Sequence, residues 1–170
     1  MKLLIGIVIL SASCVGCARS ADESFASVPA QREMLLGGLK SYSAPEEVRT
    51  AMAALKWQVL EDSGGSPRDS RPAFHVLTLV VSPFKDHGCV GELRLEFFNR
   101  RLMSTWFYPE DPSAYRAAVQ PFPATGVVGG ELRSPRLRVW SASDYRKRVY
   151  FAWCDERLLR EQERWIEKFA

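Results

Sequence analysis

The stretch Gly91–Pro109 restricts the fold more than any other part of the chain, because it predicts a β-hairpin. A two-residue loop at Asn99–Arg100 brings two apolar rows together. Three pairs then form the inner face: Phe97 with Leu102, Leu95 with Ser104, and Leu93 with Trp106. The outer face carries the charged Arg94 and Glu96, so a shift by one residue would bury charge and the register should be firm. Arg100 accepts a positive φ less readily than Asn99, which leaves a longer loop with a bulge as the alternative.

The remaining apolar patterns predict an α+β domain around that hairpin. Its antiparallel sheet has about five or six strands, with an N-terminal helix packed on it and a C-terminal helix after the last strand. Ser43 and Glu46 have the capping-box spacing, which predicts a helix from Ser43 to about Lys56. Asp111–Pro112 predicts a second helix start, and the apolar spacing after Asp155 predicts the terminal helix. Further strands are expected at residues 57–62, 74–84, 137–141 and 148–154.

Residues 1–16 join one lysine to an apolar run and then to small residues, a pattern typical of a secretory signal. The stretch resembles the signal peptide of bacterial lipoproteins, which is cut before a cysteine that then carries lipid. Cys17 leaves the longer apolar segment and is the expected lipidation site, with Cys14 as the alternative. In that family the residue after the lipidated cysteine directs sorting. Ala18 at this position implies the outer membrane, with the domain facing the periplasm.

Residues 17–31 are small and polar, which predicts a flexible tether between the lipid and a single domain at residues 32–170. The helix start at Ser43–Val48, in a small lipoprotein, is also similar to the accessory lipoproteins of outer-membrane β-barrel assembly. The alternative to a cleaved signal is an N-terminal helix that anchors the chain in a membrane.

The chain contains four cysteines, and the loss of Cys14 and lipidation of Cys17 would leave Cys89 and Cys154. Two thiols in an oxidising compartment predict a disulfide between Cys89 and Cys154. The alternative is a pair of reduced thiols, because the geometry that a disulfide needs is not visible in a sequence.

No motif in the chain predicts catalysis, a metal or a cofactor. The turn Asp86–Cys89 places a histidine near a cysteine, without the third orienting group that a thiol hydrolase usually needs. A zinc site would require both His75 and His87 together with the two cysteines that are expected to pair. The glycine-rich residues 126–130 are not followed by Lys-Ser or Lys-Thr, and no GxSxG motif occurs. We therefore expect a protein that is not an enzyme.

The charge balance argues against nucleic acid as a partner. The chain has 23 basic and 20 acidic residues and a net charge of +3, and removal of Lys2 with the signal lowers this further. The long stretch Gln120–Pro135 is rich in Pro and Gly, and it carries apolar and arginine side chains of the kind that anchor interfaces. The expected partner-binding residues are Phe122, Val127, Val128, Arg133, Arg136 and Arg138.

Together these features predict a non-catalytic binding or scaffold module that is held at the membrane by its lipid and engages an envelope protein. The alternative is an inhibitor or immunity protein of the envelope that blocks a partner enzyme. A loop that inserts into a partner's cleft would favour the inhibitor, whereas a broad flat patch would favour the scaffold.

Overall fold

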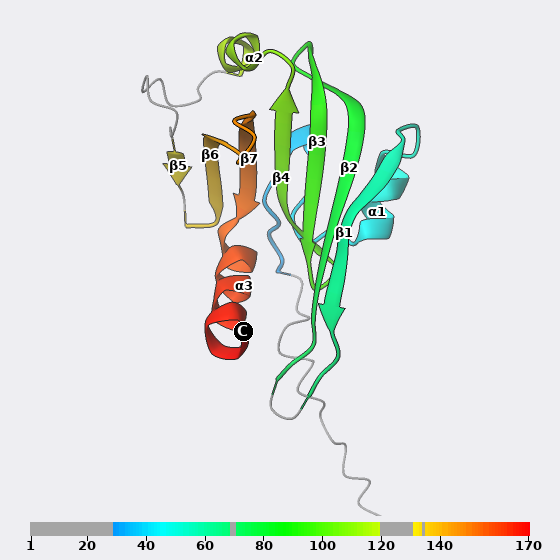
Figure 1. Cartoon of the computed structure of the whole chain (residues 1–170), viewed down its shortest axis with the longest axis vertical. Coiled ribbons are helices and arrows are strands. Elements are labelled where there is room, and N and C mark those ends of the chain that lie inside the picture. Colours follow the sequence, from blue (N-terminus) through cyan, green and yellow to red (C-terminus); the bar gives the residue numbers. More distant parts are fainter. Residues whose placement is uncertain (1–28, 69–70, 120–130, 134) are drawn as a thin grey trace, which may run out of the picture.

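A computed structural model describes residues 29–68, 71–119, 131–133 and 135–170, which form an α+β fold (Figure 1). Seven strands build one antiparallel sheet in the order β1-β2-β3-β4-β7-β6-β5. The strands are β1 (Trp57–Gly65), β2 (Phe74–Asp86), β3 (Cys89–Phe98), β4 (Arg101–Pro109), β5 (Glu131–Arg133), β6 (Leu137–Ser143) and β7 (Val149–Asp155). The helices are η2 (Leu36–Gly38), α1 (Pro45–Ala51), α2 (Pro112–Ala118) and α3 (Glu156–Phe169). The α+β class, the antiparallel sheet and the C-terminal helix are therefore confirmed.

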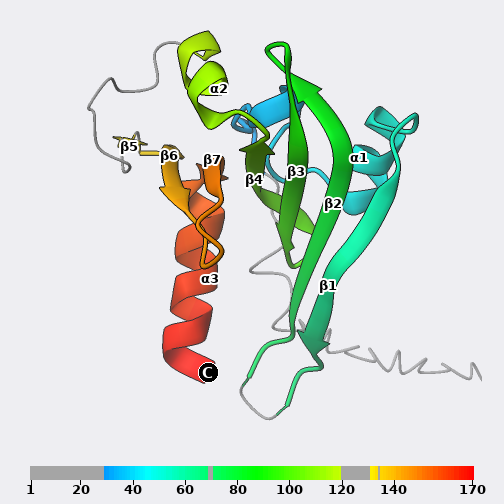
Figure 2. The ribbon, with the colours of Figure 1, turned by 45° about the horizontal axis from the view of Figure 1, so that its top comes forward.

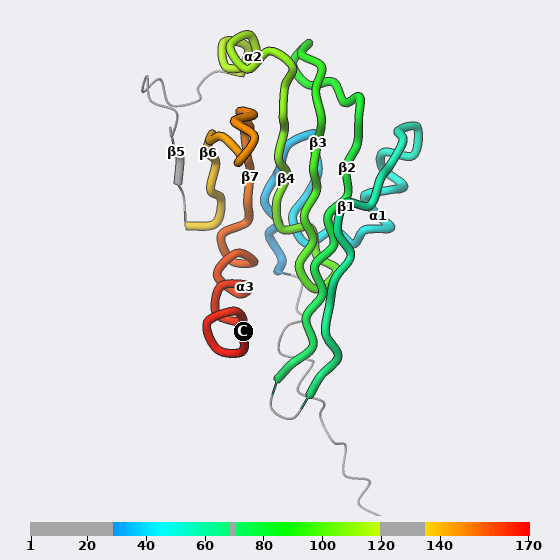
Figure 3. Tube along the Cα trace, viewed as in Figure 1, coloured from blue at the N-terminus to red at the C-terminus, as the bar shows by residue number. Residues whose placement is uncertain are grey.

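The sheet has a long part, β1 to β4, and a shorter part, β5 to β7. Figure 3 shows β7 and β6 on the side of β4 that is away from β3. The strand β5 lies inside the long stretch Gln120–Pro135, where the sequence predicts no strand. Its Arg133 pairs with Arg138 of β6. Three residues are too short a run for a period-two pattern to stand out, so the sequence does not reveal this strand. Within the described part of the chain, no helix has the length and apolarity to cross a membrane.

The hairpin β3–β4 forms where the sequence predicts it, but its register changes after the first pair. Asn99 and Arg100 both adopt positive φ, at 48° and 60°, so the tight turn forms despite the arginine. Phe97 pairs with Leu102 as expected, and Met103 is then an extra residue in β4. Beyond this bulge the expected register is wrong: Leu95 pairs with Thr105, Leu93 with Phe107, Glu96 with Ser104, and Arg94 with Trp106.

The N-terminal helix is shorter than the sequence predicts. The N-cap is Ala44 rather than Ser43, its backbone N–H donates to Glu47 Oε2 at 3.3 Å, and the helix ends at Ala51 rather than near Lys56. Within α1, only Pro45 and Val48 are buried. The expectation that this helix covers a face of the sheet is therefore not supported, because seven residues present too little apolar surface for that role.

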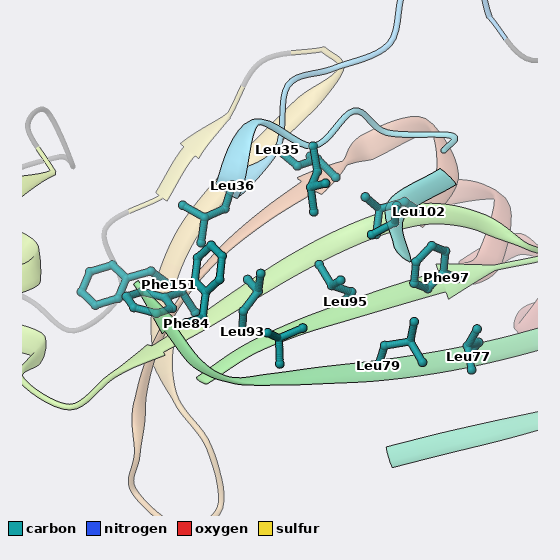
Figure 4. Packing of buried hydrophobic residues seen from close by; sticks show 14 of the residues in the cluster. Leu35, Leu36, Leu77, Leu79, Phe84, Leu93, Leu95, Phe97, Leu102 and Phe151 are labelled. Carbon is teal, nitrogen blue, oxygen red and sulfur yellow. The ribbon is translucent and has the colours of Figure 1, made fainter. Parts of the chain in front are cut away.

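One face of the sheet, here called the closed face, carries the larger apolar core. It includes Leu79 of β2, Leu93 and Leu95 of β3 and Phe107 of β4, each fully buried. Figure 4 shows Leu35 and Leu36, from the segment before α1, lying over this face. The other members of this core are Leu39, Val48, Leu77, Val81, Phe84, Phe97, Leu102, Tyr115, Val139 and Phe151.

The opposite face, here called the pocket face, is covered in part by α3, which continues directly from the end of β7 (Figure 2). Asp155 caps α3 by accepting from the backbone N–H of Arg157 at 3.0 Å. Leu158 and Trp165 of α3 join a second apolar cluster, in which Trp165 lies 4.3 Å from the ring of Phe74. The remaining buried members of this cluster are Tyr42, Phe98, Met103 and Cys154.

Candidate ligand-binding pocket

A single row of side chains crosses the pocket face, with one residue from each of six strands. The pairing register sets this row, since residues that pair across strands share a face. From β1 to β6 its members are Glu61, Thr78, Glu96, Ser104, Cys154 and Arg138. All six line a pocket of about 390 Å³. The row therefore forms the floor of a concave site.

Two bulges put polar residues into that row. In β1, Leu60 is the extra residue between Val59 and Glu61, so Glu61 rather than Leu60 pairs with Thr78. In β4, the extra residue Met103 brings Ser104 opposite Glu96. Without these bulges both polar side chains would point toward the closed face. A bulge reverses the facing of every later residue in its strand, and here it re-aims polar groups into the pocket.

The walls of the pocket come from different elements. Trp106 of β4 and Trp140 of β6 meet edge to face, with their ring centroids 5.9 Å apart. Trp106 also stacks on Tyr150 at 4.6 Å, and the Arg138 guanidinium lies 4.9 Å from the Trp140 ring. These contacts hold the two indoles in fixed orientations. The other lining residues are Val76, Phe97 and Met103 of the sheet and Leu159, Gln162 and Glu163 of α3.

The helical wall is held in place by an ion pair between α3 and the sheet. Arg101 of β4 donates through two nitrogens to the two carboxylate oxygens of Glu161, at 3.1 and 2.5 Å. The two side chains are only 9% and 13% exposed, which limits solvent screening of the pair. At the far end of α3, Trp165 Nε1 donates to the carbonyl oxygen of Pro72 at 3.3 Å. The position of Gln162 and Glu163 relative to the floor is thus fixed from both sides.

Glu96 is the central polar group of the floor. The Ser104 hydroxyl donates to Glu96 Oε2 at 2.6 Å, and Trp106 Nε1 donates to Ser104 Oγ at 2.8 Å. Burial raises the pKa of the Glu96 carboxyl, and the hydrogen bonds from Ser104 and Trp106 oppose that rise only in part. The negative charge of Glu61 raises the pKa of Glu96 further. Glu96 is half-buried and lines the pocket.

The remaining reactive groups on the floor are poorly suited to nucleophilic attack. Ser104 is 1% exposed, and its oxygen is already used in two hydrogen bonds. Burial also raises the pKa of the Cys154 thiol, so the thiolate that a cysteine nucleophile requires is disfavoured. The arrangement offers groups for binding rather than for covalent chemistry.

The partner-binding residues expected from the sequence fall in different places. Phe122, Val127 and Val128 lie outside the described residues, as does the side chain of Arg133. Arg136 is exposed, and its guanidinium donates to the side chain of Gln31. Arg138 is the member of that set that lines the pocket.

The lipidation candidates Cys14 and Cys17 lie outside the described residues, and the structure does not bring Cys89 and Cys154 together. Both are free thiols, so the expected bridge is absent here. Cys89 packs against the core of the closed face, whereas Cys154 lies on the pocket face. Cys154 also lies in the same row across the strands as Glu96 of β3. Glu96 is seven residues along β3 from Cys89, so the two cysteines are separated by about 23 Å along the strand direction, which no disulfide spans.

Among the described residues, no group of three or more His, Cys, Asp or Glu side chains is placed to hold a metal ion. The zinc ligands considered from the sequence are also separated. His75 Nε2 lies 2.7 Å from Asp62 Oδ1, while His87 occupies the β2–β3 turn with a φ of 45°.

The sequence indicated no functional role for Glu96, Ser104, Trp106 or Trp140, and the expected register placed Ser104 and Trp106 on the inner face of the hairpin. One signal was present, because a regular hairpin would have placed the hydroxyl of Ser104 in an apolar core opposite Leu95. Comparison with known proteins adds no further guide: the chain matches no protein-family model, and a search of curated proteins finds no relative.

Proposed function

We propose that this protein is a non-catalytic binding module of the bacterial envelope and that the pocket is its ligand site. A lipid on Cys17 would hold it at the periplasmic side of the outer membrane. The observation that carries the proposal is the pocket itself, in which a row of polar groups forms the floor and two indoles in contact with each other form part of the wall. This combination of aromatic walls and few polar groups is characteristic of small-molecule sites.

A binding role also agrees with the protonation behaviour of the floor. Burial disfavours the charged forms of both Glu96 and Cys154, so neither side chain is prepared to act as an anionic nucleophile. Buried groups with fixed hydrogen bonds instead present a preformed surface to a ligand.

The start of the described domain supports the proposed division into tether and domain. Arg157 Nη1 donates to the Gln31 carbonyl oxygen at 3.1 Å, and the Arg136 guanidinium donates to the Gln31 side chain. The chain is therefore fastened to the domain at the residue where the expected tether, residues 17–31, ends. The alternative role as an inhibitor depends on residues 120–130, which lie outside the described part of the chain.

The proposal is tested by asking whether the pocket retains a compound. The purified mature protein is equilibrated with a small-molecule extract of the envelope and examined by native mass spectrometry. Gln162→Trp fills the pocket from α3 and should abolish retention, because Gln162 lines it. The matched control Ile166→Trp places the same side chain on an exposed position of the same helix and should retain the compound. Equal retention by both variants, or none by the unaltered protein, contradicts a ligand site here.

The anchoring step is tested separately by labelling cells with a fatty-acid analogue. Cys17→Ala should take up no label, while Cys14→Ala should be labelled as the unaltered protein is. The reverse result would assign the lipid to Cys14, and label that persists when both cysteines are replaced together would refute a lipid on either cysteine.

A further inference from the structure

We propose that the pocket binds an aliphatic amine cation, with its ammonium group between Glu61 and Glu96. This inference rests on the proposed function, since it names the ligand class of the same site. A small alkylamine or polyamine is the occupant that the charge and the shape of the pocket favour together.

The charges of the lining residues are unevenly distributed. Three carboxyl groups face the pocket, Glu61 from β1, Glu96 from β3 and Glu163 from α3, against the single guanidinium of Arg138. Arg138 lies over Trp140 at the β6 end of the row, three strands away from Glu96. The pocket is therefore acidic toward β1 and β3 and basic toward β6, which directs a cation to the acidic end.

Within the described residues, no cation forms an ion pair with Glu96. The positive charge of Arg94 opposes the rise of the Glu96 pKa only weakly, and Arg94 Nε already donates to Glu92 Oε1 at 2.7 Å. A carboxyl in such surroundings either stays protonated or ionises next to a cation. A bound ammonium would supply that cation, and it would also relieve the repulsion between Glu61 and Glu96.

The apolar walls suit an alkyl chain. Val76, Met103 and Leu159 contribute aliphatic and thioether surface, and the indole of Trp106 lines the pocket beside them. The volume of about 390 Å³ lies at the lower end of the range for small-molecule sites. An anionic ligand of the same size would meet three carboxyl groups, so the charges disfavour it.

The test compares two probes that differ only in their terminal groups. Isothermal titration calorimetry of the mature protein with 1,6-diaminohexane should give saturable binding. The uncharged 1,6-hexanediol, which has the same chain, should bind at least tenfold more weakly. Binding that is equal for the two probes would overturn the proposal, because the ammonium would then contribute nothing.

Matched variants locate the charge. Glu96→Gln keeps the shape of the side chain but cannot ionise, and it should weaken diamine binding at least tenfold. Glu61→Gln, at an exposed position that needs no refolding of the core, should weaken it severalfold. Glu110→Gln removes an exposed carboxylate outside the pocket and should leave the affinity unchanged. Diamine affinity that stays the same in both Glu96→Gln and Glu61→Gln would overturn the assignment.

The outcomes separate the ligand class from the proposed function. If the diamine does not bind but an extract compound is retained and is lost in Gln162→Trp, the pocket is a ligand site and the amine assignment is wrong. If neither is retained, the proposed function falls as well.

Discussion

The two faces of the same strands differ in what covers them and in what they carry. On the closed face, Leu79, Leu95 and Phe107 are fully buried beneath the N-terminal segment. On the pocket face, the alternate positions of those strands carry Thr78, Glu96 and Ser104, and α3 covers the sheet only in part. The closed face thus supplies most of the hydrophobic stabilisation, which leaves the pocket face free to hold polar groups.

The pocket face is not simply the solvated side of an antiparallel sheet. Its polar groups are connected to one another, as the chain of hydrogen bonds from Trp106 to Ser104 to Glu96 shows. The second apolar cluster covers one end of the pocket face around Phe74 and Trp165. This division predicts that substitutions on the two faces have separable effects on stability and on binding.

The largest expected effect is on the closed face. Leu95→Ala should lower the free energy of unfolding by about 3 kcal/mol, because it opens a cavity in a fully buried core. Val76→Ala, at a half-buried position of the pocket face, should cost about 1 kcal/mol. Urea unfolding measures both values. Equal losses would show that the two faces contribute alike to stability.

A smaller loss is expected where α3 meets the sheet. Arg101→Met leaves the Glu161 carboxylate partly buried without its bidentate partner, and should cost about 2 kcal/mol. The double variant with Glu161→Gln should recover part of that loss in a double-mutant cycle. If the two losses are simply additive, this pair does not hold the wall of the pocket.

The third effect is a change in pH dependence. The folded-state pKa of Glu96 is raised above the unfolded value of about 4.3, so its favourable contribution is present at low pH and is lost as pH rises through the folded-state pKa. Glu96→Gln removes this loss, so its stability relative to the unaltered protein should increase with pH. The charged or titratable groups that face Glu96 or share its pocket are Glu61, Arg94, Arg138, Cys154 and Glu163. Thermal unfolding from pH 4 to 8 tests this, and a difference that shrinks as pH rises would contradict it.

The smallest expected effect is that of a reducing agent. Cys89 and Cys154 lie on opposite faces, so dithiothreitol should leave the unfolding midpoint of the mature domain unchanged. A bridge between them would close a loop whose loss costs about 4 kcal/mol in the chain-entropy model. A clear fall in the midpoint would therefore show that the two faces are linked covalently.

Local sequence signals predicted most of the elements, but of the residues that line the pocket they singled out Arg138 alone. Neighbouring residues are enough to predict the tight turn at Asn99–Arg100. They also predict the helix cap at Asp111, whose carboxylate accepts from two backbone N–H groups at 2.9 Å. The bulge at Met103 does not follow from neighbouring residues. It depends on the pairing of β4 with both β3 and β7, which are distant in the sequence. The pocket depends on that bulge and on the one at Leu60.

The row itself also depends on long-range order. It brings Glu61 of β1 and Cys154 of β7 into one line across the sheet. The order of the strands in the sheet differs from their order in the sequence, since β7 lies between β4 and β6. The start of α1 is a smaller example. The helix begins at Pro45, and its N-cap is Ala44 rather than Ser43, one residue earlier, which the sequence favoured. Such choices are decided by packing rather than by local propensity.

The most direct test of the ligand site uses the five tryptophans as reporters. Indole N–H resonances are followed by two-dimensional NMR while 1,6-diaminohexane is added to the mature protein. The indoles of Trp106 and Trp140, which line the pocket, should shift in a saturable way, whereas those of Trp57 and Trp153, which pack on the core of the closed face, should not. Saturable shifts confined to Trp57 and Trp153, or the absence of any shift at Trp106 and Trp140, would contradict this ligand site.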